Sequence, residues 1–314
     1  MSLGIHHVTA IATDPQRNLD FYVGVLGLRL VKRTVNFDDP SAYHFYYGDA
    51  LGRPGTLVTF FTWPHAPPGE TGTGMAAEVS FAIGPTSVPF WLERLRDHGI
   101  EHDTPELRFD EVTIRLRDPD GLQLSLVAHP VAEEPTPRAD GTVPARHSIA
   151  GIHGVILEEN DLDRTIDLLT GVLGFHSTAS DGDLRRLEIT SAELGTIVHV
   201  RRHLRTSPGR VGAGSIHHVA WRTPDSSTQD RARVTLLSRG LQVTAPLDRR
   251  YFRSIYFREP GGVLFEIATD PPGFTVDEPI TALGQELQLP PWLEDRRDLI
   301  ERHLPPVRVP SLDA

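Results

Sequence analysis

The chain has 314 residues, which is enough for two average domains or one large one, and enough to bury a core without covalent crosslinks. Its 31 Lys and Arg residues against 42 Asp and Glu residues give a formal net charge of −11, which argues against a nucleic-acid-binding or anionic-membrane surface. Cysteine is absent, so disulfides and thiolate metal sites are excluded, and any metal must be bound by nitrogen and oxygen.

The N-terminal segment has neither a basic region nor an uninterrupted apolar run, so we expect no signal peptide. No window of the sequence approaches the roughly 18 apolar residues that a membrane helix needs. We therefore expect a cytoplasmic protein with no membrane or nucleic-acid partner.

The sequence repeats itself at a constant offset. The segment IHHVT at 5–9 is echoed by IHGVI at 152–156, which lies 147 positions later. The segment VLGL at 25–28 recurs as VLGF at 172–175, again 147 positions later. Two separated motifs with one offset indicate an internal repeat.

A second offset relates other stretches of the chain. RDPDG at 117–121 resembles REPGG at 258–262, which lies 141 positions later. The sequence therefore predicts four related modules, near residues 4–63, 75–130, 150–202 and 214–270. Each begins with an apolar strand such as Val8–Ala12, continues through a polar turn into a helix that ends near a glycine, and closes with short strands. This pattern is a βαβββ unit.

The expected fold class is α+β, with four βαβββ modules forming two pseudo-symmetric halves, because one such unit leaves a hydrophobic sheet face exposed until a second unit covers it. We predict three segments in sequence. Residues 1–135 hold the first pair of modules, residues 145–272 hold the second pair, and residues 273–314 form a C-terminal tail with a helix. The tail helix is expected to pack across a domain face, over the mouth of the active site or at a subunit contact.

Chemistry is expected where the modules differ. At the start of the first strand the four modules carry different residues: His7, Ala77, Gly154 and His218. In the last strand, Ser125 of the second module corresponds to Glu266 of the fourth. Two imidazoles and one carboxylate form the facial triad typical of non-haem Fe(II), with open positions for substrate and O₂. A carboxylate inside an apolar strand is costly to bury without such a cation.

Each candidate imidazole has a histidine beside it, and adjacent strand residues face opposite ways. His7 and His218 match the spacing to the downstream turn, so we interpret them as ligands flanked by His6 and His217. A single His-His pair is more often structural, but two pairs at equivalent positions favour a metal site. Six other histidines do not lie at equivalent positions of the modules, and we interpret them as surface or packing residues: His44, His65, His129, His147, His199 and His203.

These residues resemble the vicinal oxygen chelate superfamily, whose βαβββ modules close around one metal. More narrowly, GIHHVT at 4–9, RLVKRTVNFD at 29–38 and LPPWLE at 289–294 resemble ring-cleaving dioxygenases that act on para-hydroquinones. The resemblance extends over essentially the whole chain. It implies the same three metal ligands, with the first drawn from module one rather than module three. It therefore implies that module one pairs with module four, and module two with module three.

The resemblance also implies a set of catalytic residues around the metal: His6, Thr9, His217, Arg249 and Tyr256. A flanking histidine could take the proton of a substrate hydroxyl, because its unperturbed pKa of about 6.5 lies near operating pH. The arginine could stabilise developing negative charge, and the tyrosine could donate a hydrogen bond. Arg250 is adjacent to Arg249, and either could face the site. Without the resemblance, Arg249 and Tyr256 read as a surface charge and a sheet aromatic.

The leading hypothesis is an Fe(II)-dependent dioxygenase that inserts both atoms of O₂ into a hydroquinone-type ring, next to a hydroxyl-bearing carbon. Mn(II) is the alternative metal, since the ligand set admits both. A second hypothesis is a glyoxalase-like, metal-dependent isomerase or lyase, which usually needs a second acidic ligand. A third is an aromatic- or drug-binding resistance protein. The expected partners are a small aromatic substrate and O₂, while the ring substituents and homo-oligomerisation stay open.

Overall fold

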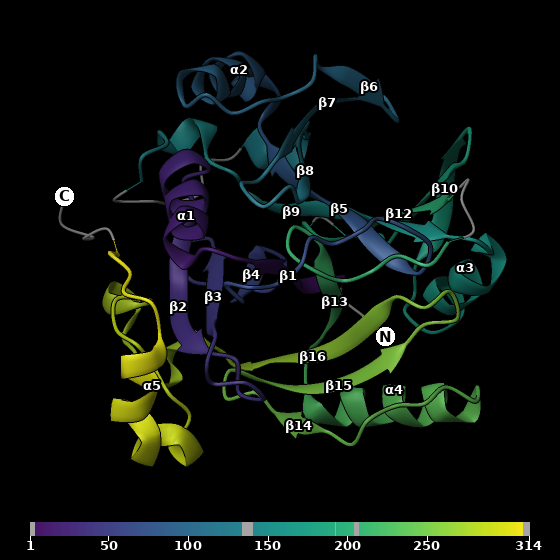
Figure 1. Ribbon diagram of the computed structural model, residues 1–314. Helices are drawn as coiled ribbons and strands as arrows, with labels where there is room; N and C mark the ends of the chain where they lie inside the picture. The colour runs from purple at the N-terminus through teal and green to yellow at the C-terminus, as the bar shows by residue number, and fades with distance from the viewer. Residues whose placement is uncertain (1–3, 134–140, 192, 204–206, 310–314) are drawn as a thin grey trace.

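The structure is a computed structural model that describes residues 4–133, 141–191, 193–203 and 207–309. Within these residues the strands form two eight-stranded sheets, with helices on their outer sides (Figure 1). None of the described helices is long and apolar enough to cross a membrane. Part of the Pro-rich midpoint stretch, residues 134–140, lies outside the described residues.

Four modules with the same order of elements follow one another along the chain. The first contains β1 (Ile5–Ala12), α1 (Pro15–Leu19), β2 (Arg29–Val35), β3 (Tyr43–Gly48) and β4 (Leu57–Thr62). The second contains β5 (Met75–Ile83), α2 (Val88–Asp97), β6 (Glu106–Arg108), β7 (Glu111–Arg117) and β8 (Gln123–Ala128). The third contains β9 (Gly151–Glu159), α3 (Leu162–Gly171), β10 (His176–Asp181), β11 (Leu184–Glu188) and β12 (Ile197–Arg202). The fourth contains β13 (Ile216–Thr223), α4 (Ser226–Ser238), β14 (Leu247–Asp248), β15 (Phe252–Arg258) and β16 (Leu264–Pro272). The predicted βαβββ repeat is therefore confirmed.

Each sheet joins two modules: the first sheet joins the first and last modules of the chain, and the second joins the two middle ones. One sheet has the strand order β14-β15-β16-β13-β1-β4-β3-β2, and the other has the order β10-β11-β12-β9-β5-β8-β7-β6. The antiparallel pair β1–β13 joins the first module to the fourth, and β5–β9 joins the second to the third. The predicted pairing of modules 1+4 and 2+3 is confirmed. The pairing of modules 1 and 4 brings the first and last modules of the chain into one sheet.

Aspartates set the start of the helices in three modules. Asp14 accepts a hydrogen bond from the backbone of Arg17 at the start of α1, and Asp225 accepts one from Thr228 at the start of α4. Asp161 caps α3 in the same way. Such caps satisfy backbone N–H groups that the first helical turn leaves unpaired. Because each cap follows its first strand at a fixed distance, the caps also fix the register of the strand that carries the site.

The core lies between the sheets and their helices, where aromatic residues such as Tyr22, Trp91, Trp221 and Phe265 are almost fully buried. The helix α4 packs against β13, β15 and β16, opposite the concave face of the sheet (Figure 1). The polar side chains described below lie on that concave face.

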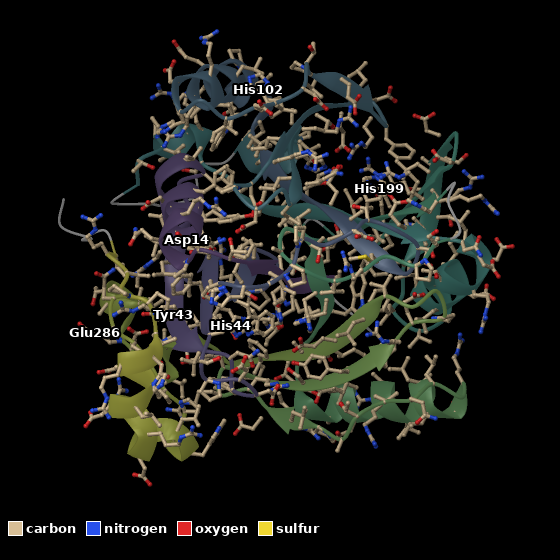
Figure 2. The ribbon with its side chains drawn as sticks, viewed as in Figure 1. Asp14, Tyr43, His44, His102, His199 and Glu286 are labelled. Carbon is tan, nitrogen blue, oxygen red and sulfur yellow. The ribbon has the colours of Figure 1, made fainter. Side chains whose placement is uncertain are left out.

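The C-terminal tail lies along the outer edge of the first sheet. Leu287 pairs with Arg33 of the edge strand β2, and the backbone N–H of Gln288 donates to the Arg33 carbonyl at 2.9 Å. A helical segment then runs into α5 (Arg297–His303), and the Tyr43 hydroxyl donates to the Pro305 carbonyl. Figure 2 labels Tyr43 on this side of the molecule, beside the tail. The tail thus covers backbone groups that an edge strand would otherwise expose.

Candidate metal centre

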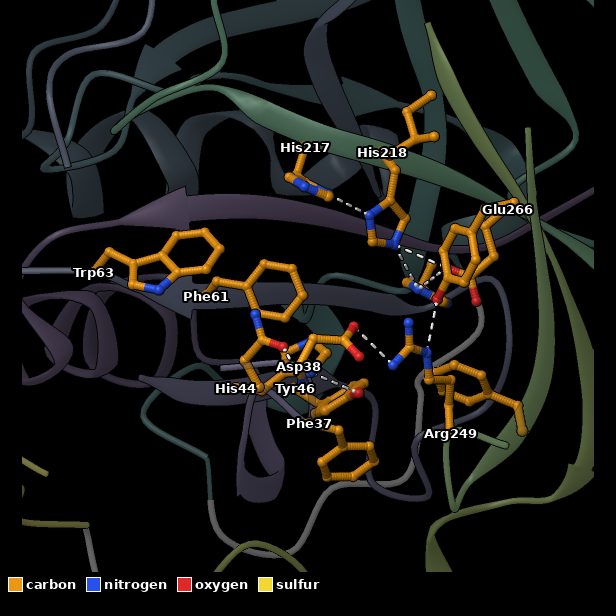
Figure 3. Close-up of a pocket in the computed structure, with 15 residues that line it drawn as sticks. Phe37, Asp38, His44, Tyr46, Phe61, Trp63, His217, His218, Arg249 and Glu266 are labelled. Carbon is orange, nitrogen blue, oxygen red and sulfur yellow. Dashed lines mark hydrogen bonds and ion pairs between the residues drawn. The ribbon is translucent and has the colours of Figure 1, made fainter. Parts of the chain in front are cut away.

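Three predicted ligands come from three strands that are neighbours in the first sheet. His7 lies on β1, His218 on β13 and Glu266 on β16, and all three are almost completely buried. Glu266 Oε2 is 2.9 Å from His218 Nε2 and 3.4 Å from His7 Nε2, and the two Nε2 atoms are 3.4 Å apart (Figure 3). The three side chains therefore present one ligand atom each to a common point.

These distances fit a divalent ion. With metal–ligand bonds of about 2.1 Å, adjacent ligands of an octahedral ion lie about 3 Å apart. Glu266 Oε2 is buried and has no well-aligned hydrogen bond among the described residues, despite its proximity to His218. Burial lowers the pKa of His218, which favours the neutral imidazole that binds metals. The donor set is therefore one buried carboxylate oxygen and two imidazole nitrogens, and a divalent cation bound between them would offset the cost of burying the carboxylate.

Each ligand has a partner that fixes its orientation. His7 Nδ1 is 2.9 Å from His6 Nδ1, and His218 Nδ1 is 2.8 Å from His217 Nδ1. Ser254 on β15 donates its hydroxyl proton to Glu266 Oε1. Hydrogen bonds of this kind hold the side chain of a metal ligand and tune its basicity. The two His-His pairs are therefore equivalent in geometry as well as in sequence.

A cavity of about 350 Å³ opens beside the three ligands. Aromatic side chains form much of its wall, including Phe252 and the three that Figure 3 labels, Phe37, Phe61 and Trp63. Its size and apolar walls are typical of a site for a small organic molecule. The cavity can therefore hold one aromatic ring against the candidate metal position.

The residues expected around the metal divide into two groups. His217, Arg249 and Tyr256 line the cavity. His6 and Thr9 are buried and do not line it: His6 packs against Phe252, with ring centroids 5.1 Å apart, and the Thr9 hydroxyl is hydrogen-bonded to Thr59 at 2.8 Å. His6 is thus placed to act through the ligand beside it, and Thr9 to support the cavity wall.

Arg249 rather than Arg250 faces the cavity. Arg249 Nε donates to the Tyr256 hydroxyl at 3.2 Å, and its Nη1 is 3.0 Å from Asp38 Oδ2. Arg250 has a φ of 67° and turns its guanidinium toward Asp277, at 3.6 Å. Burial raises the pKa of Tyr256, so its hydroxyl stays protonated.

His44, interpreted from the sequence as a surface or packing residue, is buried and packs against Tyr46 and Phe61, and it also lines the cavity. Its Nε2 is 2.9 Å from the Thr59 hydroxyl, and its Nδ1 is 2.9 Å from the Tyr46 hydroxyl. It lies on β3, which carries no repeated histidine, so the comparison of modules gave no signal for it. The alternation in YHFYY at 43–47 was the available clue, since residues 44 and 46 face the same side of a strand.

The second sheet holds a counterpart of this site in which the ligands are replaced. In the second sheet Glu78 pairs with Ile156, and in the first sheet His218 pairs with Thr9. Thr9 and Ile156 are equivalent positions, because they are separated by the repeat offset of 147 residues. The residue equivalent to His218 is therefore Glu78, and the expected equivalence with Ala77 is wrong by one position. The pairing skips one residue at the equivalent place in both sheets, Ala77 in β5 and His217 in β13, so the first strands of the second and fourth modules align at an offset of 140 residues rather than 141.

The other two equivalent positions explain why this counterpart has no metal-binding set. Gly154 corresponds to His7, and a Cβ at Gly154 would lie 2.6 Å from the Ile197 carbonyl oxygen, so no side chain fits there. Ser125 corresponds to Glu266 and donates to Glu78 at 2.7 Å. Arg108 lies 2.6 Å from the Glu78 carboxylate and supplies the positive charge in this sheet.

Comparisons with known proteins agree with this architecture. The family model described as "Glyoxalase/Bleomycin resistance protein/Dioxygenase superfamily" matches residues 4–126 and 151–267. The chain is 42% identical over 315 residues to a Bacillus subtilis protein named "Putative ring-cleaving dioxygenase MhqO", with 99% of each chain covered. It is 30% identical over 307 residues to "Chlorohydroquinone/hydroquinone 1,2-dioxygenase" of Sphingobium indicum, with 95% of each chain covered.

Solved structures give the same result. A crystal structure described as a "putative dioxygenase from Bacillus subtilis" matches with a TM-score of 0.94 and 41% identity over 99% of each chain. Glyoxalase I from Zea mays matches with a TM-score of 0.62 and 17% identity, over 85% of this chain and 92% of that chain, and so shares the fold. The chain belongs to the glyoxalase/bleomycin resistance protein/dioxygenase superfamily, and both relatives described above are named as dioxygenases.

Proposed function

We propose that this protein is an Fe(II)-dependent dioxygenase that cleaves a hydroquinone-type ring next to a hydroxyl-bearing carbon and inserts both atoms of O₂. The observation that carries this proposal is the convergence of His7, His218 and Glu266 beside an aromatic-walled cavity. The names of the full-length relatives support the class of reaction and of substrate.

His7, His218 and Glu266 would hold the metal, and three protein ligands leave positions open for other molecules. Iron(II) bound there supplies the electron needed to activate O₂ and favours ionisation of a coordinated phenol. Mn(II) suits the same ligand set.

The chain's own residues would orient the substrate and hold its charge. The aromatic walls would hold the ring, and His217, whose Nδ1 accepts a hydrogen bond from His218 Nδ1–H when His218 Nε2 faces the metal, can donate its Nε2–H to a substrate oxygen. The Arg249 guanidinium can hold negative charge on a substrate oxygen, and the Tyr256 hydroxyl can donate a hydrogen bond to it. A site that fixes the ring and the charge in this way lowers the entropic cost of reaching the reactive arrangement.

The test is oxygen uptake by protein loaded anaerobically with Fe(II) and then mixed with hydroquinone and ¹⁸O₂. We expect stoichiometric uptake and a ring-opened product that carries two labelled atoms. Glu266→Gln should abolish both turnover and iron binding, while the exposed-site control Glu93→Gln should match the wild type.

Two other results would contradict the proposal, and each points to one of the remaining hypotheses. Hydroquinone that binds and is recovered unchanged favours a binding protein. Turnover of a glutathione hemithioacetal without oxygen uptake favours a glyoxalase-like isomerase. The second sheet does not favour a glyoxalase-like isomerase, which usually needs a second acidic ligand. Glu78 is paired with Arg108 there, and Gly154 has no side chain.

A further inference from the structure

A second group of two histidines and one glutamate lies in the other sheet. Glu111 begins β7, His129 follows β8 and His153 lies on β9. Glu111 Oε1 is 3.1 Å from His153 Nε2 and 3.6 Å from His129 Nε2, and one ligand atom of each residue lies within 4.8 Å of the other two. The group is distinct from the counterpart site described above, because it shares none of the residues Glu78, Ser125 and Gly154.

The net charge of the side chains around this group is negative, so a bound cation would be favourable. Arg186 contributes +1 and lies 2.6 Å from Glu111 Oε2, and it also pairs with Glu188. With two neutral imidazoles, Arg186 (+1), Glu111 (−1) and Glu188 (−1) sum to a net charge of −1. Arg186 also holds Oε2, so that Oε1 is the oxygen turned to both imidazoles. This is the role that Ser254 plays for Glu266 in the first site.

The group is accessible on one side and buried on the other. His153 is 2% exposed, whereas the side chain of His129 is 24% exposed. A cavity of about 210 Å³ borders His129, His153 and Arg186 and reaches the segment 188–191. It has space for water molecules that would complete the coordination of an ion held by three side chains.

We infer that Glu111, His129 and His153 form a second site for a divalent transition-metal ion. Two imidazole nitrogens and one carboxylate oxygen suit Zn²⁺ or Co²⁺, which bind such ligands with water in the remaining positions. The ion would tie β7 and β8 of the second module to β9 of the third. We assign this ion a stabilising role, because its three ligands come from both modules of the second sheet.

The experiment counts Co²⁺ per chain by equilibrium dialysis and follows its visible absorption spectrum. We expect two equivalents for the wild type, one for His218→Ala combined with Glu266→Gln, one for His129→Ala, and none when all three substitutions are combined. Thr190→Ala, which borders the cavity without being a ligand or carrying charge, should keep two equivalents. Because His129 is partly exposed, His129→Ala should fold, and circular dichroism checks this.

A melting curve gives an independent readout. In the His218→Ala and Glu266→Gln background, Zn²⁺ should raise the melting temperature, and His129→Ala should remove that rise. A wild-type protein that binds one equivalent, all of it lost with His218→Ala and Glu266→Gln, would overturn the inference. The count does not depend on turnover, so its failure is distinguishable from failure of the dioxygenase proposal.

Discussion

Ser254 donates its hydroxyl proton to one oxygen of Glu266 and leaves the other oxygen facing His7 and His218. The two residues lie on the neighbouring strands β15 and β16 and are fully buried. Without this bond the carboxylate could rotate about its terminal torsion, because the energy of that torsion angle varies little over a broad range. Ser254 therefore selects the rotamer in which Glu266 can act as a ligand.

Ser254→Ala should weaken metal binding about 10- to 100-fold, the range found when a partner of a metal ligand is removed. Competition with a chromophoric chelator measures the dissociation constant directly. Ser177→Ala, a substitution of an exposed serine, should leave it unchanged. An unaltered constant for Ser254→Ala would mean that packing alone holds the carboxylate.

Asp38 reaches from the loop after β2 to the guanidinium of Arg249 across the cavity. Its side chain is 73% exposed, so the ion pair is worth less than about 1 kcal/mol. Asp38→Asn should therefore raise the KM for hydroquinone about two- to fivefold, with a smaller effect on kcat. Steady-state kinetics measure both, and Asp103→Asn, which removes a similar exposed pair with Arg115, is the matched control. Equal KM values for the two variants would exclude a positioning role for Asp38.

Lys32 is fully buried between β2 and the tail. Its Nζ lies 2.6 Å from Asp277 Oδ1, contacts the Glu278 carboxylate and sits 5.0 Å from the centroid of Tyr251. Lys32→Ala would leave the buried carboxylate of Glu278 without its cation, while Asp277 keeps Arg250, and should cost about 3–5 kcal/mol of unfolding free energy.

Urea denaturation compares this variant with Glu70→Gln, which removes the exposed Arg210–Glu70 pair and should cost less than about 1 kcal/mol. Similar losses for the two variants would show that the tail contributes little to stability.

Glu159 is a buried carboxyl beside Glu259, between the third and fourth modules. Burial, together with the neighbouring carboxylate of Glu259, raises the pKa of Glu159 to about 9. In the pH range from about 5 to 9 the folded protein therefore keeps a proton that the unfolded chain has released, and the free energy of unfolding falls as pH rises. This stabilisation is complete below the unfolded pKa and is lost as the pH passes through the folded pKa.

Glu159→Gln keeps the shape of the side chain and removes its titration. Its melting temperature should exceed that of the wild type at pH 9, and the gap should narrow toward pH 5. Differential scanning calorimetry across this range gives the comparison, with the exposed Glu93→Gln as control. A gap that does not vary with pH would assign the dependence to another group.

The repeat was readable in the sequence because equivalent elements keep their spacing along the chain. The Asp caps at 14, 161 and 225 and the glycines after the helices set that spacing locally. His7, His218 and Glu266 stand out against it because each differs from its counterpart in another module. Their convergence then followed from pairing the first module with the fourth.

Two features of the site could not be predicted from the repeat. The second and fourth modules are offset by 140 residues at their first strands and by 141 at their last strands, so an offset of 141 aligned His218 with Ala77 and missed Glu78. Ser254, His44 and Asp38 have no marked counterpart in the other modules, so a comparison of modules passes over them.

The sequence by itself determined the four modules, their α+β character and the three candidate ligands, because these depend on periodicity and on differences between repeats. Only the tertiary structure decided which side chains surround the ligands and how they are oriented. The cavity wall combines β3, β4 and the loop after β2 in the first module with β15 in the fourth, and these two parts of the chain meet only once the sheet has curled. Contacts of that kind are set by packing and strand register, and neither is encoded at any single position.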